Sequence, residues 1–140
     1  MTRDEMLALL ERRGSAWKRR DPAAFVADFA EDAIVDSPTG GTTMGKVAIK
    51  ALFRNWTSAF PDVEWTRESA VIDGNRAAVG FRIAGTHGGP FLGVAPTSRR
   101  FEIRGITLIT VRDGKIVYER RIYDFTGFLV QLGLIKPFSE

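Results

Sequence analysis

The apolar positions in the first 60 residues recur at helical spacing. A capping-box pair, Thr2 with Glu5, opens a helix that is predicted to run to Trp17. Asp21–Pro22 combines an N-cap with a proline at the first helical position, so a short second helix follows. The segment 49–60 has the longest apolar stripe, formed by Ile49, Leu52, Phe53, Trp56 and Phe60. Three helices are therefore predicted in the N-terminal half.

The second half has the pattern of strands joined by tight turns. Asp73–Gly74–Asn75 and Asp113–Gly114 are hairpin signals. The predicted strands are Val63–Ile72, Ala77–Ala84, Phe101–Val111 and Ile116–Asp124, with a short one at Ala33–Val35 before a turn at Pro38–Gly41. Phe125–Leu134 is predicted to close the chain as a short helix. The order predicts an α+β fold, in which three N-terminal helices pack on a curved, mostly antiparallel sheet that encloses a small-molecule cavity.

Composition limits the classes of protein to consider. The 140 residues, 44% hydrophobic and 26% charged, are typical of one soluble domain spanning 1–140. No apolar run approaches the length of a membrane span, and the N-terminus lacks a signal peptide, so we expect a cytoplasmic protein. The chain has no cysteine and one histidine. This composition excludes thiolate chemistry and multi-histidine metal sites within one chain, and no metal site is predicted.

The net charge of +3 does not form a continuous basic patch. The basic clusters at Lys18–Arg19–Arg20 and Arg99–Arg100 are interrupted by Asp21 and Glu102. A solvated basic surface is therefore predicted, and nucleic-acid binding is not.

Asp124 ends the last predicted strand. If Asp113–Gly114 forms a two-residue hairpin, Arg112 pairs with Lys115, and Asp124 lies opposite Ile103. The same face then holds Phe101, Ile103, Thr107, Ile109, Tyr118, Arg120 and Ile122. A carboxylate at the end of an apolar face is suited to general acid/base catalysis. Two alternatives stay open, because Asp124 is also a good N-cap for the next helix and a bulge would reverse the faces.

His87 lies in the glycine-rich loop that follows the strand Ala77–Ala84. Alternation places it on the same face as Phe81 and Ile83, and its imidazole is suited to proton transfer or to hydrogen bonding with a carbonyl. The alternative is a solvated loop histidine.

The stripe on the third helix supplies candidate cavity walls. Phe53, Trp56 and Phe60 line the cavity if this helix covers the sheet, although the same pattern fits ordinary core packing. Asn55 is a further candidate on this helix. Together with the strand positions, the predicted substrate-binding residues are Trp56, Phe60, Phe53, Asn55, Phe81, Ile103, Thr107, Tyr118 and Arg120.

Several segments resemble one family. Gly85–Thr86–His87 and Phe91–Arg99 are similar to the GTH and F.G..PTGR segments of SnoaL-like polyketide cyclases. Asp113–Val117, Tyr123–Gly133 and Phe60–Pro61–Asp62 resemble further motifs of this family, in the same order. The resemblance extends from about Asp21 to Leu134.

The resemblance implies a cone-shaped α+β barrel of the nuclear-transport-factor-2-like superfamily. It implies a cofactor-independent intramolecular aldol closure of a small polyketide-type substrate, with Asp124 as the acid/base and His87 as a pocket residue that binds a substrate oxygen. No cofactor is expected. The expected partners are a hydrophobic cyclic or polyketide-derived substrate and further copies of the chain, in a homodimer or homotetramer.

Two positions depart from the family pattern. Ser98 stands where the family's PTG segment has Gly. Arg120 stands where many members carry Trp, and an inward-facing arginine would need an anionic ligand or a carboxylate such as Asp36 or Glu64. Two further functions stay open: an epoxide-opening cyclase or hydrolase that pairs Asp124 with one of these carboxylates, and a non-catalytic small-molecule-binding protein. An Asp124 that caps the last helix and faces solvent would favour binding without catalysis.

Overall fold

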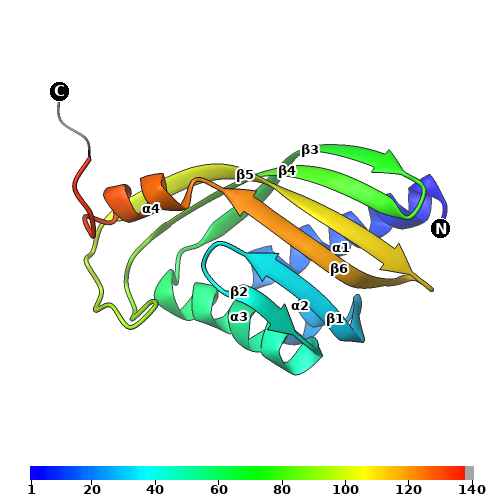
Figure 1. The fold of residues 1–140 in the computed structure, drawn as a ribbon, viewed down its shortest axis with the longest axis horizontal. Helices are drawn as coiled ribbons and strands as arrows, with labels where there is room; N and C mark the ends of the chain where they lie inside the picture. Colours follow the sequence, from blue (N-terminus) through cyan, green and yellow to red (C-terminus); the bar gives the residue numbers. More distant parts are fainter. Residues whose placement is uncertain (138–140) are drawn as a thin grey trace.

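The computed structural model describes residues 1–137 and has the predicted α+β architecture (Figure 1). The helices are α1 (Arg3–Arg19), α2 (Pro22–Val26), α3 (Lys46–Ala59) and α4 (Phe125–Gln131). The strands are β1 (Phe29–Ser37), β2 (Gly41–Met44), β3 (Glu64–Asp73), β4 (Arg76–Thr86), β5 (Arg100–Arg112) and β6 (Lys115–Tyr123). Helices α1, α2 and α3 cover one face of a curved sheet, and α4 lies beyond its end (Figure 1).

Local sequence signals start the first two helices where they were predicted. The Thr2 hydroxyl accepts a hydrogen bond from the Glu5 backbone N–H, and the Glu5 carboxylate accepts one from the Thr2 N–H. The Asp21 carboxylate accepts a hydrogen bond from the Ala24 N–H. Helix α3 has no side-chain cap, so we infer that its buried apolar face holds it in place.

The sheet has the strand order β2-β1-β6-β5-β4-β3. All neighbouring strands are antiparallel except β1 and β6, which run parallel. The short edge strand β2 was not predicted, because its polar sequence Gly41–Met44 has none of the alternation that marks a half-buried strand. The sheet is open, since β2 and β3 each pair on one side only.

A bulge in β6 decides which side chains face the helices. Arg112 pairs with Lys115 as predicted, and Val111 pairs with Ile116, but Thr110 pairs with Tyr118. Val117 is therefore an extra residue in the ladder, and every later side chain of β6 lies on the opposite face. The predicted orientation of this strand is wrong from that point on.

Beyond the bulge, Glu119, Arg121 and Tyr123 face the helices. Tyr118, Arg120 and Ile122, which were predicted to face inward, lie on the outer face of the sheet. Within residues 1–137 no helix has the length and apolar character required to cross a membrane.

Candidate functional site

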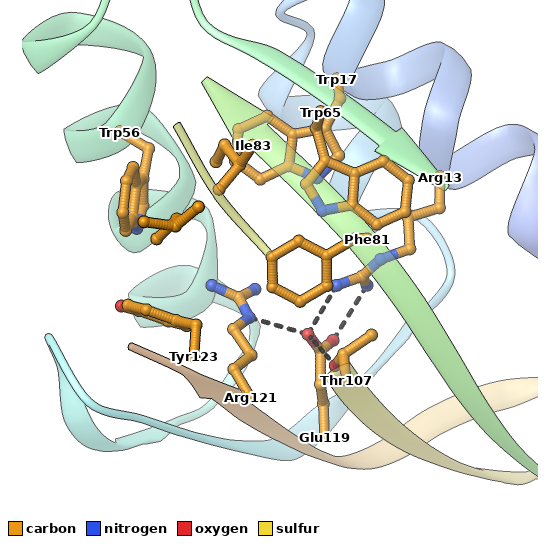
Figure 2. A pocket seen from close by; sticks show the side chains of 11 residues that line it. Arg13, Trp17, Trp56, Trp65, Phe81, Ile83, Thr107, Glu119, Arg121 and Tyr123 are labelled. Carbon is orange, nitrogen blue, oxygen red and sulfur yellow. Dashed lines mark hydrogen bonds and ion pairs between the residues drawn. The ribbon is translucent and has the colours of Figure 1, made fainter. Parts of the chain in front are cut away.

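A small cavity lies between the sheet and helices α1 and α3 (Figure 2). It is lined by Arg13, Trp17, Trp56, Trp65, Phe81, Ile83, Ile103, Thr107, Glu119, Arg121 and Tyr123. About 20 Å³ is open to the centre of a water molecule, which is room for one ordered water. A larger ligand therefore needs some of these side chains to move.

Aromatic rings form most of the cavity wall. All three tryptophans of the chain line it. The Trp65 ring stacks between Trp17, at 6.4 Å between centroids, and Phe81, at 5.9 Å. Such rings supply a large apolar contact area with few rotatable bonds.

A buried cluster of charges occupies one end of the cavity (Figure 2). The Glu119 carboxylate is fully buried and accepts two hydrogen bonds from the Arg13 guanidinium. Arg13 Nη1 donates to Oε1 at 2.9 Å, and Nη2 donates to Oε2. Arg121 Nε donates to Glu119 Oε2 at 2.7 Å, and the Thr107 hydroxyl donates to the same oxygen at 3.0 Å. Both carboxylate oxygens are thus engaged by partners on three different elements.

These neighbours control the protonation state of Glu119. Burial alone would raise its pKa, but the charges and hydrogen bonds of Arg13 and Arg121 outweigh burial and lower the pKa to about 2. The Arg13 guanidinium also lies over two rings, 5.0 Å from the Phe25 centroid and 5.8 Å from that of Trp65. Glu119 is therefore an anion at neutral pH and a weak base.

The cluster carries one more positive charge than negative. Arg13 and Arg121 share the single carboxylate of Glu119, and no other acidic residue among residues 1–137 lines the cavity. In the part of the chain that the structure describes, the two terminal amino groups of Arg121 make no hydrogen bond. Figure 2 shows them turned away from Glu119, toward the space beside Tyr123, Trp56 and Phe81.

Tyr123 closes the cavity next to Arg121. Its hydroxyl donates to the Thr39 hydroxyl at 2.9 Å, which ties β6 to the turn between β1 and β2. Burial raises the pKa of Tyr123, so its phenol stays protonated and remains a hydrogen-bond donor at neutral pH.

The structure brings only part of the predicted binding set to this cavity. Trp56, Phe81, Ile103 and Thr107 line it, and their predicted role in substrate binding stays a prediction. Phe53 and Phe60 belong to the core outside the cavity lining, and Asn55 is exposed to solvent.

Tyr118 and Arg120 form an outer-face network with Asp36. The Tyr118 hydroxyl donates to Asp36 at 2.6 Å, and Arg120 lies 3.9 Å from the same carboxylate. Arg120 therefore has an expected carboxylate partner, Asp36, but the pair lies on the outer face of the sheet and not in the cavity. Glu64 is instead exposed and lies near Arg82. Neither carboxylate lines the cavity, and the pairing of Asp124 with one of them, which the epoxide-opening alternative requires, stays a prediction.

His87 is fully buried, so the solvated-loop alternative is wrong. Its Nδ1 accepts a hydrogen bond from the Thr97 N–H at 3.2 Å, which places the ring proton on Nε2. Nε2 has no hydrogen-bond partner among residues 1–137, and the ring packs 5.6 Å from that of Phe60. His87 does not line the cavity.

Asp124 caps helix α4 and is exposed. Its carboxylate accepts a hydrogen bond from the Gly127 N–H at 2.8 Å. The expectation that Asp124 faces the cavity opposite Ile103 is wrong. Because of the bulge at Val117, the preceding residue, Tyr123, faces the cavity instead. Its catalytic role stays a prediction.

Arg13, Glu119 and Arg121 were not predicted from the sequence. One signal for Arg13 was present, because this arginine lies on the apolar stripe of α1, three residues after Leu10 and four before Trp17. No glycine, proline or other turn residue marks the bulge at Val117. Without the bulge, the alternation of β6 predicts that Tyr118 and Ile122 face the helices and that Glu119 and Arg121 face outward. Among residues 1–137 no three side chains are grouped to hold a metal ion.

Comparison with known proteins agrees with this fold. The family model of SnoaL-like polyketide cyclases matches residues 8–132. The chain belongs to the SnoaL-like polyketide cyclase family. No curated protein matches it.

Several solved structures share this fold. IdmH from Streptomyces antibioticus, to which a polyketide cyclase activity has been ascribed, is 27% identical, with a TM-score of 0.75 over 90% of this chain and 96% of its own. TsrD from Streptomyces laurentii is 24% identical, with a TM-score of 0.86 over 96% and 99%. AclR from Streptomyces galilaeus, to which a hydroxylase activity has been ascribed, is 24% identical, with a TM-score of 0.84 over 99% and 87%. The last two likenesses concern the fold alone.

Proposed function

We propose that this SnoaL-like chain is an acid/base enzyme of the cyclase type, which closes a ring in a small polyketide-type substrate. The observation that supports this proposal most is the cavity itself, in which donor groups of Arg121 lie among aromatic walls. Hydrogen-bond donors fixed in a dry site stabilise negative charge that develops on a substrate oxygen.

The reaction is an intramolecular aldol closure. A base removes the proton of a C–H group flanked by carbonyls, and the electron pair forms an enolate. The enolate carbon attacks an aldehyde carbon of the same molecule, and the resulting alkoxide takes up a proton. Substrate and product are isomers. In this scheme Arg121 stabilises the enolate oxygen, and the aromatic side chains hold the reacting groups together.

Asp124 is the base that we propose. Glu119 is unsuited, since its carboxylate accepts hydrogen bonds from two arginines and a threonine and its pKa is lowered to about 2. Asp124 accepts one backbone hydrogen bond and forms no ion pair among the described residues. It follows the cavity residue Tyr123 directly, and catalysis requires its side chain to leave the cap and turn toward the cavity.

Deuterium exchange tests enolate formation separately from ring closure. The purified chain is incubated in D₂O with aromatic 1,3-dicarbonyl compounds that carry an aldehyde. NMR then follows loss of the activated proton, and chromatography follows appearance of the isomeric ring. We expect both, and the absence of both across the panel would contradict the proposal.

Two substitutions separate the catalytic role of Asp124 from its capping role. Asn is also a good N-cap, so Asp124→Asn retains the cap but removes the base, and we expect kcat to fall at least ~10²-fold with little change in stability. Asp124→Ala removes both, with a further loss of about 1 kcal/mol in the free energy of unfolding. Full activity of Asp124→Asn would exclude Asp124 as the base.

Binding without turnover is the second candidate function. It is favoured by the exposed, capping position of Asp124 and by the small volume of the cavity. A chain that binds members of the panel but promotes neither exchange nor ring closure would have this function.

A further inference from the structure

The polar groups of the cavity are almost all donors. Arg13 Nε and Trp17 Nε1 are buried without a hydrogen-bond partner among residues 1–137. The terminal amino groups of Arg121 also make no hydrogen bond within residues 1–137, although they are not fully buried. Both oxygens of Glu119 already accept hydrogen bonds. A ligand that fits this site must therefore supply acceptor oxygens.

The charge of the cavity also favours a ligand with acceptor oxygens, and one that is negatively charged. The excess positive charge lies on buried groups, as the side chains of Arg13 and Arg121 are only 5% and 10% exposed. Two buried cations that share one carboxylate leave a positive charge only partly compensated, which is costly, and a planar guanidinium pairs best with two oxygens in one plane. A carboxylate and the enolate of a 1,3-dicarbonyl both present such oxygens.

We propose that the cavity recognises an aromatic molecule with an anionic oxygen pair, which Arg121 binds while the rings of Trp17, Trp56 and Trp65 surround its apolar body. This inference rests on the proposed function in that it names the substrate class of the same site. A neutral ester would leave the charge of the cluster uncompensated. Glu119 acts as a positioning residue, because its bond to Nε fixes the direction of the Arg121 fork.

Trp65 indicates how such a molecule enters. This half-buried ring lines the cavity on one side and, on the other, an outer groove of about 500 Å³ between α1 and β3. The groove is bordered by Lys18, Arg20 and one acidic residue, Glu64. Displacement of the Trp65 ring joins the cavity to a groove whose positive charge attracts an anion.

The test compares charged and neutral probes of the same shape. The probes are 2-naphthoate, its neutral isostere 2-naphthamide, and 2-acetylindane-1,3-dione, which is an enolate at neutral pH. Binding is measured by calorimetry and by the NMR shifts of the three indole N–H groups, all of which lie on cavity residues. We expect each anion to bind at least ~10-fold more tightly than the amide. The largest shift is expected at Trp17, because its indole N–H is the one that is fully buried without a partner among residues 1–137.

Neighbouring arginines on opposite faces give a matched pair of variants. Arg121→Gln is expected to abolish the preference for the anions while the amide still binds, and Arg120→Gln is expected to change neither. Arg121→Lys, which retains the charge without the fork, should recover part of the preference. Circular dichroism and thermal melts confirm that each variant is folded.

The outcomes separate this inference from the proposed function. Equal binding of anion and amide, or a preference that survives Arg121→Gln, would overturn the inference but leave ring closure of a neutral substrate intact. Failure of all three probes to shift the indole signals would also overturn it. Anion preference without exchange or ring closure would support it and contradict the proposed function. If only one anion is preferred, that result identifies which oxygen pair the fork accepts.

Discussion

The two faces of β6 carry similar residues in very different environments. Beyond the bulge, the inner face has Glu119 and Arg121 in a buried cluster, and the outer face has Arg120, which is 56% exposed beside Asp36. Adjacent arginines thus differ in burial, in hydrogen bonding and in the length of their contacts. One extra residue in a strand, and not residue type, therefore decides which arginine lines the cavity.

The largest expected difference between the faces is in the free energy of unfolding. Glu119→Gln leaves two buried arginines without a counterion, and we expect a loss of about 3–5 kcal/mol. Arg120→Gln breaks an exposed pair and should cost no more than about 1 kcal/mol. Urea unfolding at neutral pH measures both. Adding Arg13→Met to Glu119→Gln should restore part of the loss, and equal losses on the two faces would contradict the comparison.

Acid should remove much of the contribution that ionised Glu119 makes to the free energy of unfolding. The pKa of Glu119 is about 2 in the folded chain and 4.5 ordinarily. Because the folded value is the lower one, its contribution is complete above about pH 4.5 and disappears as the pH falls toward 2. The loss is about 3 kcal/mol.

Unfolding free energies measured across this pH range check the acid effect. Glu119→Gln should flatten the acid limb. The outer carboxylate Asp36 also has a lowered pKa, chiefly through its hydrogen bond from Tyr118. Asp36→Asn should therefore flatten the limb too, but by less. A larger effect of Asp36→Asn than of Glu119→Gln would show that the outer-face carboxylate contributes more to acid stability than the inner one, which contradicts the expected order.

Replacing glycine by alanine should also cost more stability on the inner face of the sheet than on the outer face. A Cβ on Gly105 would lie 2.5 Å from the Ile122 backbone oxygen, 2.7 Å from the Phe81 ring and 2.9 Å from Tyr123 Cβ. Gly105→Ala should therefore displace β6 as well as the cavity side chains and cost about 1–3 kcal/mol. A Cβ on Gly80 would meet only the side chain of Ser69, which can rotate, apart from a distant backbone atom. Gly80→Ala should therefore cost less in thermal unfolding. If the two substitutions cost the same, packing on the inner face is no tighter than on the outer one.

The smallest expected effect is a gain in stability at the helix beneath the inner face. A Cβ on Gly14 would lie 4.0 Å from the Trp65 ring, an ordinary contact. Gly14→Ala should then stabilise α1 by up to about 1 kcal/mol, seen as a Tm a few degrees higher. A lower Tm would indicate that Trp65 requires the space that Gly14 leaves.

Much of the fold was predictable because its signals are local. The cap at Thr2, the cap at Asp21 and the apolar stripe of α3 each mark a helix within a few residues. The hairpin at Asp113–Gly114 was also predicted with its first pair, Arg112 with Lys115. The family was predicted from motifs that are spread along the chain.

The candidate site was less predictable because it depends on pairing at long range. The partner of Arg13 lies 106 residues away on β6, and the face of that partner depends on a bulge that no turn residue announces. The predicted site residues Tyr118 and Arg120 were on the right strand but on the wrong face. Their apolar neighbour Ile122, 53% exposed, also lies on the outer face, whereas the charged residues Glu119 and Arg121 lie on the inner one.

The parallel pairing of β1 with β6 also constrains the order in which the chain folds. During synthesis, Phe29–Ser37 leaves the ribosome long before Lys115–Tyr123, and until then β1 has only the short hairpin partner β2. Arg13 has no carboxylate to pair with in the same period, because Glu119 is on the late strand. Contacts that close such long loops form slowly. When β6 is made, it thus completes the sheet and supplies the carboxylate for Arg13 in one step. In a nascent chain that stops before β6, the Arg13 guanidinium lacks the counterion with which it is buried in the folded chain.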